Sequence, residues 1–300
     1  MSMATTNESL KEPAVLSPAQ EFWYFFKQNR GAVAGLMVIS IFVFIAVFAP
    51  LLAPHNPTEV FSDALRLPPK WQPGGDPRFF LGTDDVGRDQ LSRLIFGARI
   101  SMGIGFLVVL LSATTGAALG LVAGYFGGWI DQIIMRLVDI RMSLPSILMA
   151  IVFVAILGPN FFNTILAVST VAIPSFIRIV RGSVLAEKNK QYVIASQSFG
   201  ASSFRQMFIN ILPNCMAPLI VQSTLGFSDG ILDAAALGFL GLGAQPPTPE
   251  WGTMLADARP FIESLPYMVT LPGVCILTVV LAFNLLGDGL RDALDPRLKR

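Results

Sequence analysis

The chain has 300 residues, of which 53% are hydrophobic and 14% are charged, and its formal net charge is +1. Soluble domains carry about 25% charged residues, so this composition excludes an ordinary water-exposed globule. The near-neutral charge gives no reason to expect nucleic acid as a partner. Because the chain has a single histidine and no phosphate-binding glycine motif, we expect it to hold no catalytic site, cofactor or metal itself.

Long stretches of the chain lack Asp, Glu, Lys, Arg and His altogether. They cover residues 31–54, 100–130 and 142–177, and between residues 260 and 287 the only charged side chain is Glu263. A membrane-spanning helix needs about 20 mainly apolar residues, whereas the strands of a membrane barrel are about half as long. The sequence therefore predicts an all-α membrane protein that crosses the bilayer several times.

The N-terminal region consists of a polar segment followed by an aromatic one. Residues 1–16 are expected to form a mobile cytoplasmic tail, with no removable signal peptide before the first span. Ser17, Pro18 and Gln20 predict a helix start, because they supply an N-cap, a first-turn proline and a capping-box partner. Clustered aromatics beside basic residues over 17–31 favour an interfacial helix over the alternative of a partner-binding helix.

Six spans form the transmembrane domain predicted over residues 32–287, and a cytoplasmic tail is predicted over 288–300. The start of the third span is crowded with charge, and Arg136 and Asp139 are expected to pair there because they are three residues apart. The two cysteines lie in apolar runs and are expected to be buried thiols. The spans are expected near residues 32–53, 101–125, 133–157, 162–180, 214–237 and 265–287.

Basic residues indicate how these spans are oriented. Most of the 21 Lys and Arg residues fall in segments that share one side of the membrane with the N-terminus. Loops rich in Lys and Arg stay on the cytoplasmic side. Both termini are therefore predicted to be cytoplasmic, and the lipid bilayer is the first expected partner.

The second span carries small residues at helical spacing. Gly116, Gly120 and Gly124 follow one another four residues apart, with Ser112 one step earlier. Such a row forms a smooth groove that lets another helix approach closely. Two alternatives stay open for this helix-packing row, namely packing within the chain and docking of a partner subunit.

The fifth span contains two acidic residues, Asp229 and Asp233, which are four residues apart and so share one helix face. Ionisable groups within a membrane are candidates for function. Three alternatives remain open: pairing with a neighbouring helix or subunit, lining of a transport pathway, and coupling to an ion gradient.

The loop between spans four and five is the most informative segment of the chain. Around residues 192–213 it predicts two short helices separated at Gly200, which can adopt a positive φ, with the second helix stopping before Pro213. An apolar surface in this small unit is costly to leave in water, so a partner, the chain's own loops or the membrane surface should cover it. The residues expected to form this surface are Phe199, Phe204, Met207 and Phe208.

This loop resembles the EAA loop of ABC importer permeases, in which E-A-A-x-x-x-G, nine residues and I-x-L-P form a coupling helix. Ala195, Gly200, Leu212 and Pro213 match that motif. Three positions depart from it, since Ile194 replaces the Glu, Ser196 the second Ala, and Asn210 the first Ile. The resemblance implies that the loop inserts into a groove of an ATPase subunit. The residues implied to form this coupling loop are Ala195, Ser196, Phe199, Gly200, Phe204, Arg205, Leu212 and Pro213.

Three further stretches are similar to the peptide and nickel permeases within that group, and most of all to the dipeptide permease subunits. They are LGTDDVGRD at 81–89, ALGFLGLG at 236–243 with PPTPEWG at 246–252, and GDGLRDALDP at 287–296. The resemblance implies a type I ABC importer permease fold in a bacterial inner membrane.

The same resemblance implies partners and a function. The partners would be a paralogous second permease, two ATPases that bind ATP and Mg, and a periplasmic peptide-binding protein. This chain would be a non-catalytic subunit that moves dipeptides or short peptides into the cytoplasm by alternating access. Nickel complexes, haem and 5-aminolevulinate are alternative substrates. An ion-coupled secondary transporter is the main alternative of another class, and it is disfavoured by the scarcity of intramembrane charge.

Overall fold

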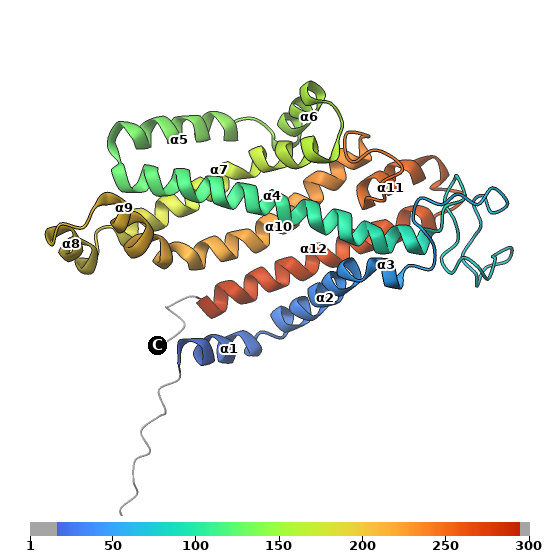
Figure 1. Cartoon of the computed structure of the whole chain (residues 1–300), viewed down its shortest axis with the longest axis horizontal. Coiled ribbons are helices and arrows are strands. Elements are labelled where there is room, and N and C mark those ends of the chain that lie inside the picture. The colour runs from blue at the N-terminus through green and yellow to red at the C-terminus, as the bar shows by residue number, and fades with distance from the viewer. Residues whose placement is uncertain (1–16, 295–300) are drawn as a thin grey trace, which may run out of the picture.

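The computed structural model describes residues 17–294, so the tail predicted over 1–16 and the end of the tail predicted over 288–300 lie outside the described residues. Within this range every regular element is a helix or a helical turn, and one isolated β-bridge joins Thr83 to Asp89. The long helices lie side by side in an elongated bundle (Figure 1). The predicted all-α class is confirmed.

Five helices of the described chain are long and apolar enough to cross a membrane, and a bent pair of helices makes a sixth crossing if it counts as one span. Polar residues extend several of these helices beyond the apolar stretches that predict them. The helix of the last span, for example, continues to Leu294, so the tail predicted from residue 288 is helical up to that point. Four of the five helices are α2 Arg30–Val47, α4 Gln90–Phe126, α7 Phe161–Glu187 and α12 Tyr267–Leu294. The fifth runs over Ser203–Phe239 and ends in α10 Met216–Phe239.

The third predicted span, 133–157, is not one straight helix. It consists of α5 Gly128–Met142 and α6 Ser146–Leu157, with a bend of 93° between them. Pro145 lies at the break and explains it, because proline donates no hydrogen bond and disfavours the helical conformation of the residue before it.

The ion pair predicted between Arg136 and Asp139 is wrong. Asp139 instead accepts a hydrogen bond from Arg178 of α7, with an Oδ1–Nη2 distance of 2.7 Å. One turn further along α7, Arg181 binds both carboxylate oxygens of Asp131, and its Nη2 lies 2.7 Å from Oδ2. Arg178 and Arg181 are three residues apart on α7, so they lie on one face of that helix and meet Asp139 and Asp131 of α5. Arg181 binds its partner through two nitrogens.

The N-terminal helix, α1 Pro18–Gln28, begins with the predicted capping box. Ser17 N–H donates to the Gln20 side chain at 3.0 Å, and Gln20 N–H donates back to the Ser17 hydroxyl. Phe26 is buried against the end of α12, whereas Trp23 is 49% exposed. The helix therefore packs along one side only and leaves aromatic side chains free, as an interfacial helix would.

The glycine row of α4 packs against α7. A Cβ added at Gly116 would lie 2.3 Å from the Cβ of Phe176, and one added at Gly124 would lie 2.8 Å from the Cβ of Val184. Gly120 lies between them and is equally close to the backbone of α7. Of the two alternatives for this row, packing within the chain is therefore the one that the structure shows.

The two ends of the bundle carry different elements (Figure 1). The N-terminal helix α1, the C-terminal end of α12 and the loop helices lie at one end, and residues 53–89 with α11 lie at the other. At this second end Asp84 accepts from Arg88 at 2.6 Å, and Arg93 and Asp257 complete a cluster of ion pairs. This cluster holds the 53–89 segment to α4 and α11. The shorter elements are α3 Ala49–Leu52, α8 Gln191–Ser198, α9 Ser203–Arg205, α11 Trp251–Ala258, and the non-α turns η1 Gln206–Ile211, η2 Leu212–Cys215 and η3 Arg259–Phe261.

Candidate functional site

The predicted coupling loop lies between α7 and α10 and is helical for most of its length. Its first helix, α8, ends in a turn where Gly200 has a φ of +82°. Ser202 then caps the next helix through a hydrogen bond that its side chain accepts from Arg205 N–H. A residue without Cβ adopts this φ with little strain, so the predicted break at Gly200 is confirmed.

The sequence predicts that the second short helix stops before Pro213, but in the structure it does not. It continues from α9 into the π-helical turn η1, the 3-10 turn η2 and then α10. Pro213 falls at the start of the 3-10 turn, where its missing N–H leaves few hydrogen bonds unmade. The loop is therefore joined to α10 by continuous helical backbone.

Aromatic side chains project from this loop at the end of the bundle. Phe199 is 92% exposed and Phe204 is 66% exposed, and the ring of Phe204 lies 4.5 Å from that of Phe208. The prediction that Met207 belongs to this surface is wrong, because Met207 is buried in a cluster with Val184 of α7. Nothing in the described chain covers the exposed rings, and a patch of this kind marks a surface for a partner.

Two departures from the EAA motif contact each other inside the loop. Asn210 Nδ2 donates to the Ser196 hydroxyl at 2.9 Å and to Gln206 Oε1 at 2.8 Å. Ile194, which stands in the place of the family's Glu, is 52% exposed and takes no part in this network. Among the other predicted loop residues, Leu212 is half-buried and three are exposed, namely Ala195, Arg205 and Pro213.

Tyr192 ties the loop to the end of α7. Its hydroxyl donates to the carboxylate of Glu187 and accepts from Asn214 Nδ2 at 3.0 Å. Burial and the hydrogen bond to Glu187 raise the pKa of Tyr192 to about 12, so this hydroxyl stays protonated near neutral pH. The ends of α7, α8 and η2 thus meet at one side chain.

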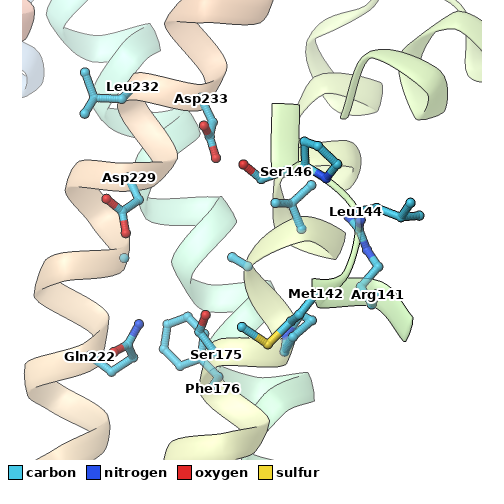
Figure 2. Close-up of a pocket in the computed structure, with 15 residues that line it drawn as sticks. Arg141, Met142, Leu144, Ser146, Ser175, Phe176, Gln222, Asp229, Leu232 and Asp233 are labelled. Atoms are coloured by element: carbon cyan, nitrogen blue, oxygen red, sulfur yellow. The ribbon is translucent and has the colours of Figure 1, made fainter. Parts of the chain in front are cut away.

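A cavity of about 550 Å³ lies between α10, α7 and the break that separates α5 from α6 (Figure 2). Asp229 and Asp233 lie one turn apart on α10 and line this cavity. Neither carboxylate has a hydrogen bond or ion pair within residues 17–294. Pairing with a neighbouring helix of this chain is therefore not observed. Asp229 is exposed on the chain, and Asp233 is half-buried.

Arg141, near the end of α5, lines the opposite wall of the cavity. Its Nε and Nη2 atoms are buried without a hydrogen-bond partner in the described chain, and its guanidinium carbon lies 5.9 Å from the ring centre of Phe153. In the sequence, Arg141 is only one of the charged residues that crowd the start of the third predicted span. The signal that could have identified it is Pro145, because the break at this proline ends α5 just after Arg141, beside the cavity.

Family models match most of the chain. One described as a binding-protein-dependent transport system inner membrane component matches residues 116–300. Another, described as the N-terminal TM domain of oligopeptide transport permease C, matches residues 17–69. Together they cover both the first span and the helices that carry the loop and the cavity.

Individual relatives align along nearly the whole chain. The dipeptide transport system permease protein DppC of Escherichia coli (strain K12) is 60% identical over 300 residues, which is 100% of both chains. The protein of the same name from Haemophilus influenzae is 56% identical over 95% of this chain and 96% of its own. The glutathione transport system permease protein GsiD of Pectobacterium atrosepticum is 42% identical over 99% of this chain and 97% of its own.

A solved structure supports the fold. The MetNI methionine ABC transporter, in an inward-facing conformation, aligns with a TM-score of 0.56 and 18% identity over 68% of this chain and 98% of that chain. This likeness confirms the predicted fold of an ABC importer permease. By its match over residues 116–300, the chain belongs to the family of binding-protein-dependent transport system inner membrane components.

Proposed function

We propose that the chain is the permease subunit of an ATP-driven importer that carries dipeptides and other short peptides across a bacterial inner membrane. The observation that carries this proposal is the 60% identity, over the full length of both chains, to a dipeptide transport permease. The more distant relative GsiD belongs to a glutathione transport system, and glutathione is itself a short peptide. Peptides are therefore favoured over nickel complexes, haem or 5-aminolevulinate.

The exposed aromatic loop supports a role in coupling to ATPases. In this proposal Phe199, Phe204 and Phe208 enter a groove on one of two partner ATPases, which bind ATP and Mg and hydrolyse the nucleotide. The loop joins α10 through helical backbone and α7 through Tyr192, so displacement of the loop would be passed to both helices. These are the helices that line the cavity.

The elements at the two ends of the helix bundle support the orientation and the other partners that we propose. α1, the described end of α12 and the coupling loop share one end of the bundle, which agrees with cytoplasmic termini (Figure 1). The opposite end, with the ion-paired segment 53–89 and α11, would receive a periplasmic peptide-binding protein. A paralogous permease would supply the other half of the pathway, and alternating access requires two such rigid bodies.

Reconstitution tests this function directly. The chain is purified with its native neighbours in mild detergent, and uptake of a labelled dipeptide into proteoliposomes is measured with and without ATP. We expect a second permease and two ATPases to co-purify, and uptake to require ATP. Transport by the chain alone, driven by an ion gradient without ATP, would contradict the proposal and establish a secondary transporter.

Gly200→Val tests the coupling loop within the same assay. Within the described chain a Cβ at Gly200 would meet nothing within 4 Å, so the strain that the substitution adds to this chain comes from the positive φ, at a cost of about 1–2 kcal/mol. We expect membrane insertion to persist and peptide uptake to be lost. Gly182→Val is the matched control, because a Cβ there also meets open space but the backbone is helical. Normal uptake by the Gly200 variant would count against the coupling role.

A further inference from the structure

Charged residues of opposite sign lie on facing walls of the cavity between α5, α7 and α10. Its only charged lining residues are Arg141 on one wall and Asp229 and Asp233 on the other. None of the three side chains forms an ion pair in the described chain, and two nitrogen atoms of Arg141 are buried without any hydrogen-bond partner. The remaining lining side chains are uncharged.

Unpaired charges inside a membrane bundle are costly, so groups of this kind are kept where a ligand or pathway uses them. A ligand that satisfies this cavity must bring an ammonium group to one wall and a carboxylate to the other. We propose that the cavity is a binding site for the two charged ends of a short zwitterionic peptide. Asp229 and Asp233 bind the ammonium group, and Arg141 binds the carboxylate.

The volume of the cavity suits a ligand of this size. Binding sites for small molecules typically have volumes of roughly 300–1,000 Å³, and this one has about 550 Å³. The two carboxylates are offset by about 6 Å along α10, at about 1.5 Å per residue. They therefore offer the ammonium group two successive positions, with Asp233 the nearer to the end that carries α11.

The uncharged lining residues bear on specificity. Ser146, Ser175 and Gln222 supply hydroxyl and amide groups that can bind a peptide bond, and the rest of the wall is mainly apolar. A site built in this way recognises the charged ends and the peptide bond of its ligand. It does not select for the charge of the ligand's side chains, and an importer of dipeptides of varied sequence needs this tolerance.

The proposal rests on the peptide-import function, and uptake by the reconstituted importer is measured first. Asp233→Asn, Asp229→Asn and Arg141→Gln should each lower kcat/KM for uptake of dialanine by about ten-fold or more, the loss expected for a charged hydrogen bond. Asp288→Asn is the control, because this exposed acid of α12 does not line the cavity. Co-purification of the ATPases shows that each variant assembles. Should a variant fail to assemble, Asp233→Glu and Arg141→Lys, which keep the charge, are expected to retain uptake.

Blocked ligands then test which end each residue binds. Binding of dialanine, its C-terminal amide and its N-acetyl form is measured on the importer without the periplasmic protein. We expect wild type to prefer the free dipeptide, Arg141→Gln to lose only the preference for a free carboxylate, and the double variant of Asp229 and Asp233 to lose only the preference for a free ammonium group. If wild type shows no such preferences, or if the variants keep them, the proposed binding site is contradicted. If wild type takes up no dipeptide with ATP, the proposed function fails instead.

Discussion

At the scale of single residues, the coupling loop is held by side chains that replace parts of the EAA motif. Asn210 and Ser196 stand where the motif has Ile and Ala, and they hydrogen-bond to each other at 2.9 Å. The side chain of Asn210 is half-buried, and without a hydrogen-bond partner it would lower the stability of the loop. Ser196 supplies that partner, so the two departures from the motif compensate each other. Their contact links α8 to η1 across the turn at Gly200.

A double-mutant cycle on this pair tests whether the contact stabilises the loop. Asn210→Ile alone leaves the Ser196 hydroxyl without its donor, and Ser196→Ala alone leaves one amide hydrogen of Asn210 without its acceptor. We expect Ser196→Ala to weaken binding of the ATPases to the detergent-solubilised permeases by about five-fold, for roughly 1 kcal/mol lost per hydrogen bond. Asn210→Ile should weaken binding further, because it also removes the hydrogen bond from Asn210 to Gln206. The double variant should bind better than the sum of the single losses predicts. Strictly additive losses would show that the contact does not stabilise the loop.

At the scale of helices, the close approach of α4 and α7 depends on glycine. A Cβ at Gly120 would lie 2.7 Å from the carbonyl oxygen of Ile177 and 2.9 Å from the Cβ of Val180, and the backbone of α7 cannot yield locally. Gly120→Leu should therefore separate the helices and lower the free energy of unfolding by about 1–3 kcal/mol or more. Thermal unfolding in detergent measures the change. Gly103→Ala is the control on the same helix, because its Cβ would meet nothing within 4 Å, and it should leave stability unchanged or raise it.

The helices also show which parts of the fold a sequence can predict. Apolar length alone located the five continuous spans, and the aligned glycines correctly indicated a close helix contact. The break between α5 and α6 depends on one proline in an otherwise apolar run, so hydropathy could not distinguish it from a continuous span. The partners of Asp131 and Asp139 lie on α7, and spacing along one helix favours only local pairs. Arg141 was missed as a site residue for the same reason, since the facing wall of the cavity comes from a distant helix.

At the scale of the whole molecule, a continuous set of contacts connects the coupling loop to the cavity. The loop is bound to the end of α7 through Tyr192 and Glu187. Helix α7 is in turn bound to α5 through the pairs Arg181–Asp131 and Arg178–Asp139. Because α5 ends beside the cavity at Arg141, displacement of the loop can change the position of one cavity wall. The two ion pairs are the links that a mutation can remove without touching the loop or the cavity.

The last prediction tests this connection. Asp131→Ala and Arg181→Ala should each leave ATP hydrolysis in place while lowering the amount of dipeptide taken up per ATP by about five-fold, the effect of losing roughly 1 kcal/mol of coupling. Both quantities are measured in proteoliposomes that contain the whole importer. Exchange of the two residues, Asp131→Arg with Arg181→Asp, restores the pair and should recover much of the lost uptake. Arg136→Ala is the control, because this exposed cation of α5 makes no ion pair in the described chain. An unchanged uptake per ATP in both single variants would mean that the Arg181–Asp131 pair does not carry the connection from the loop to the cavity.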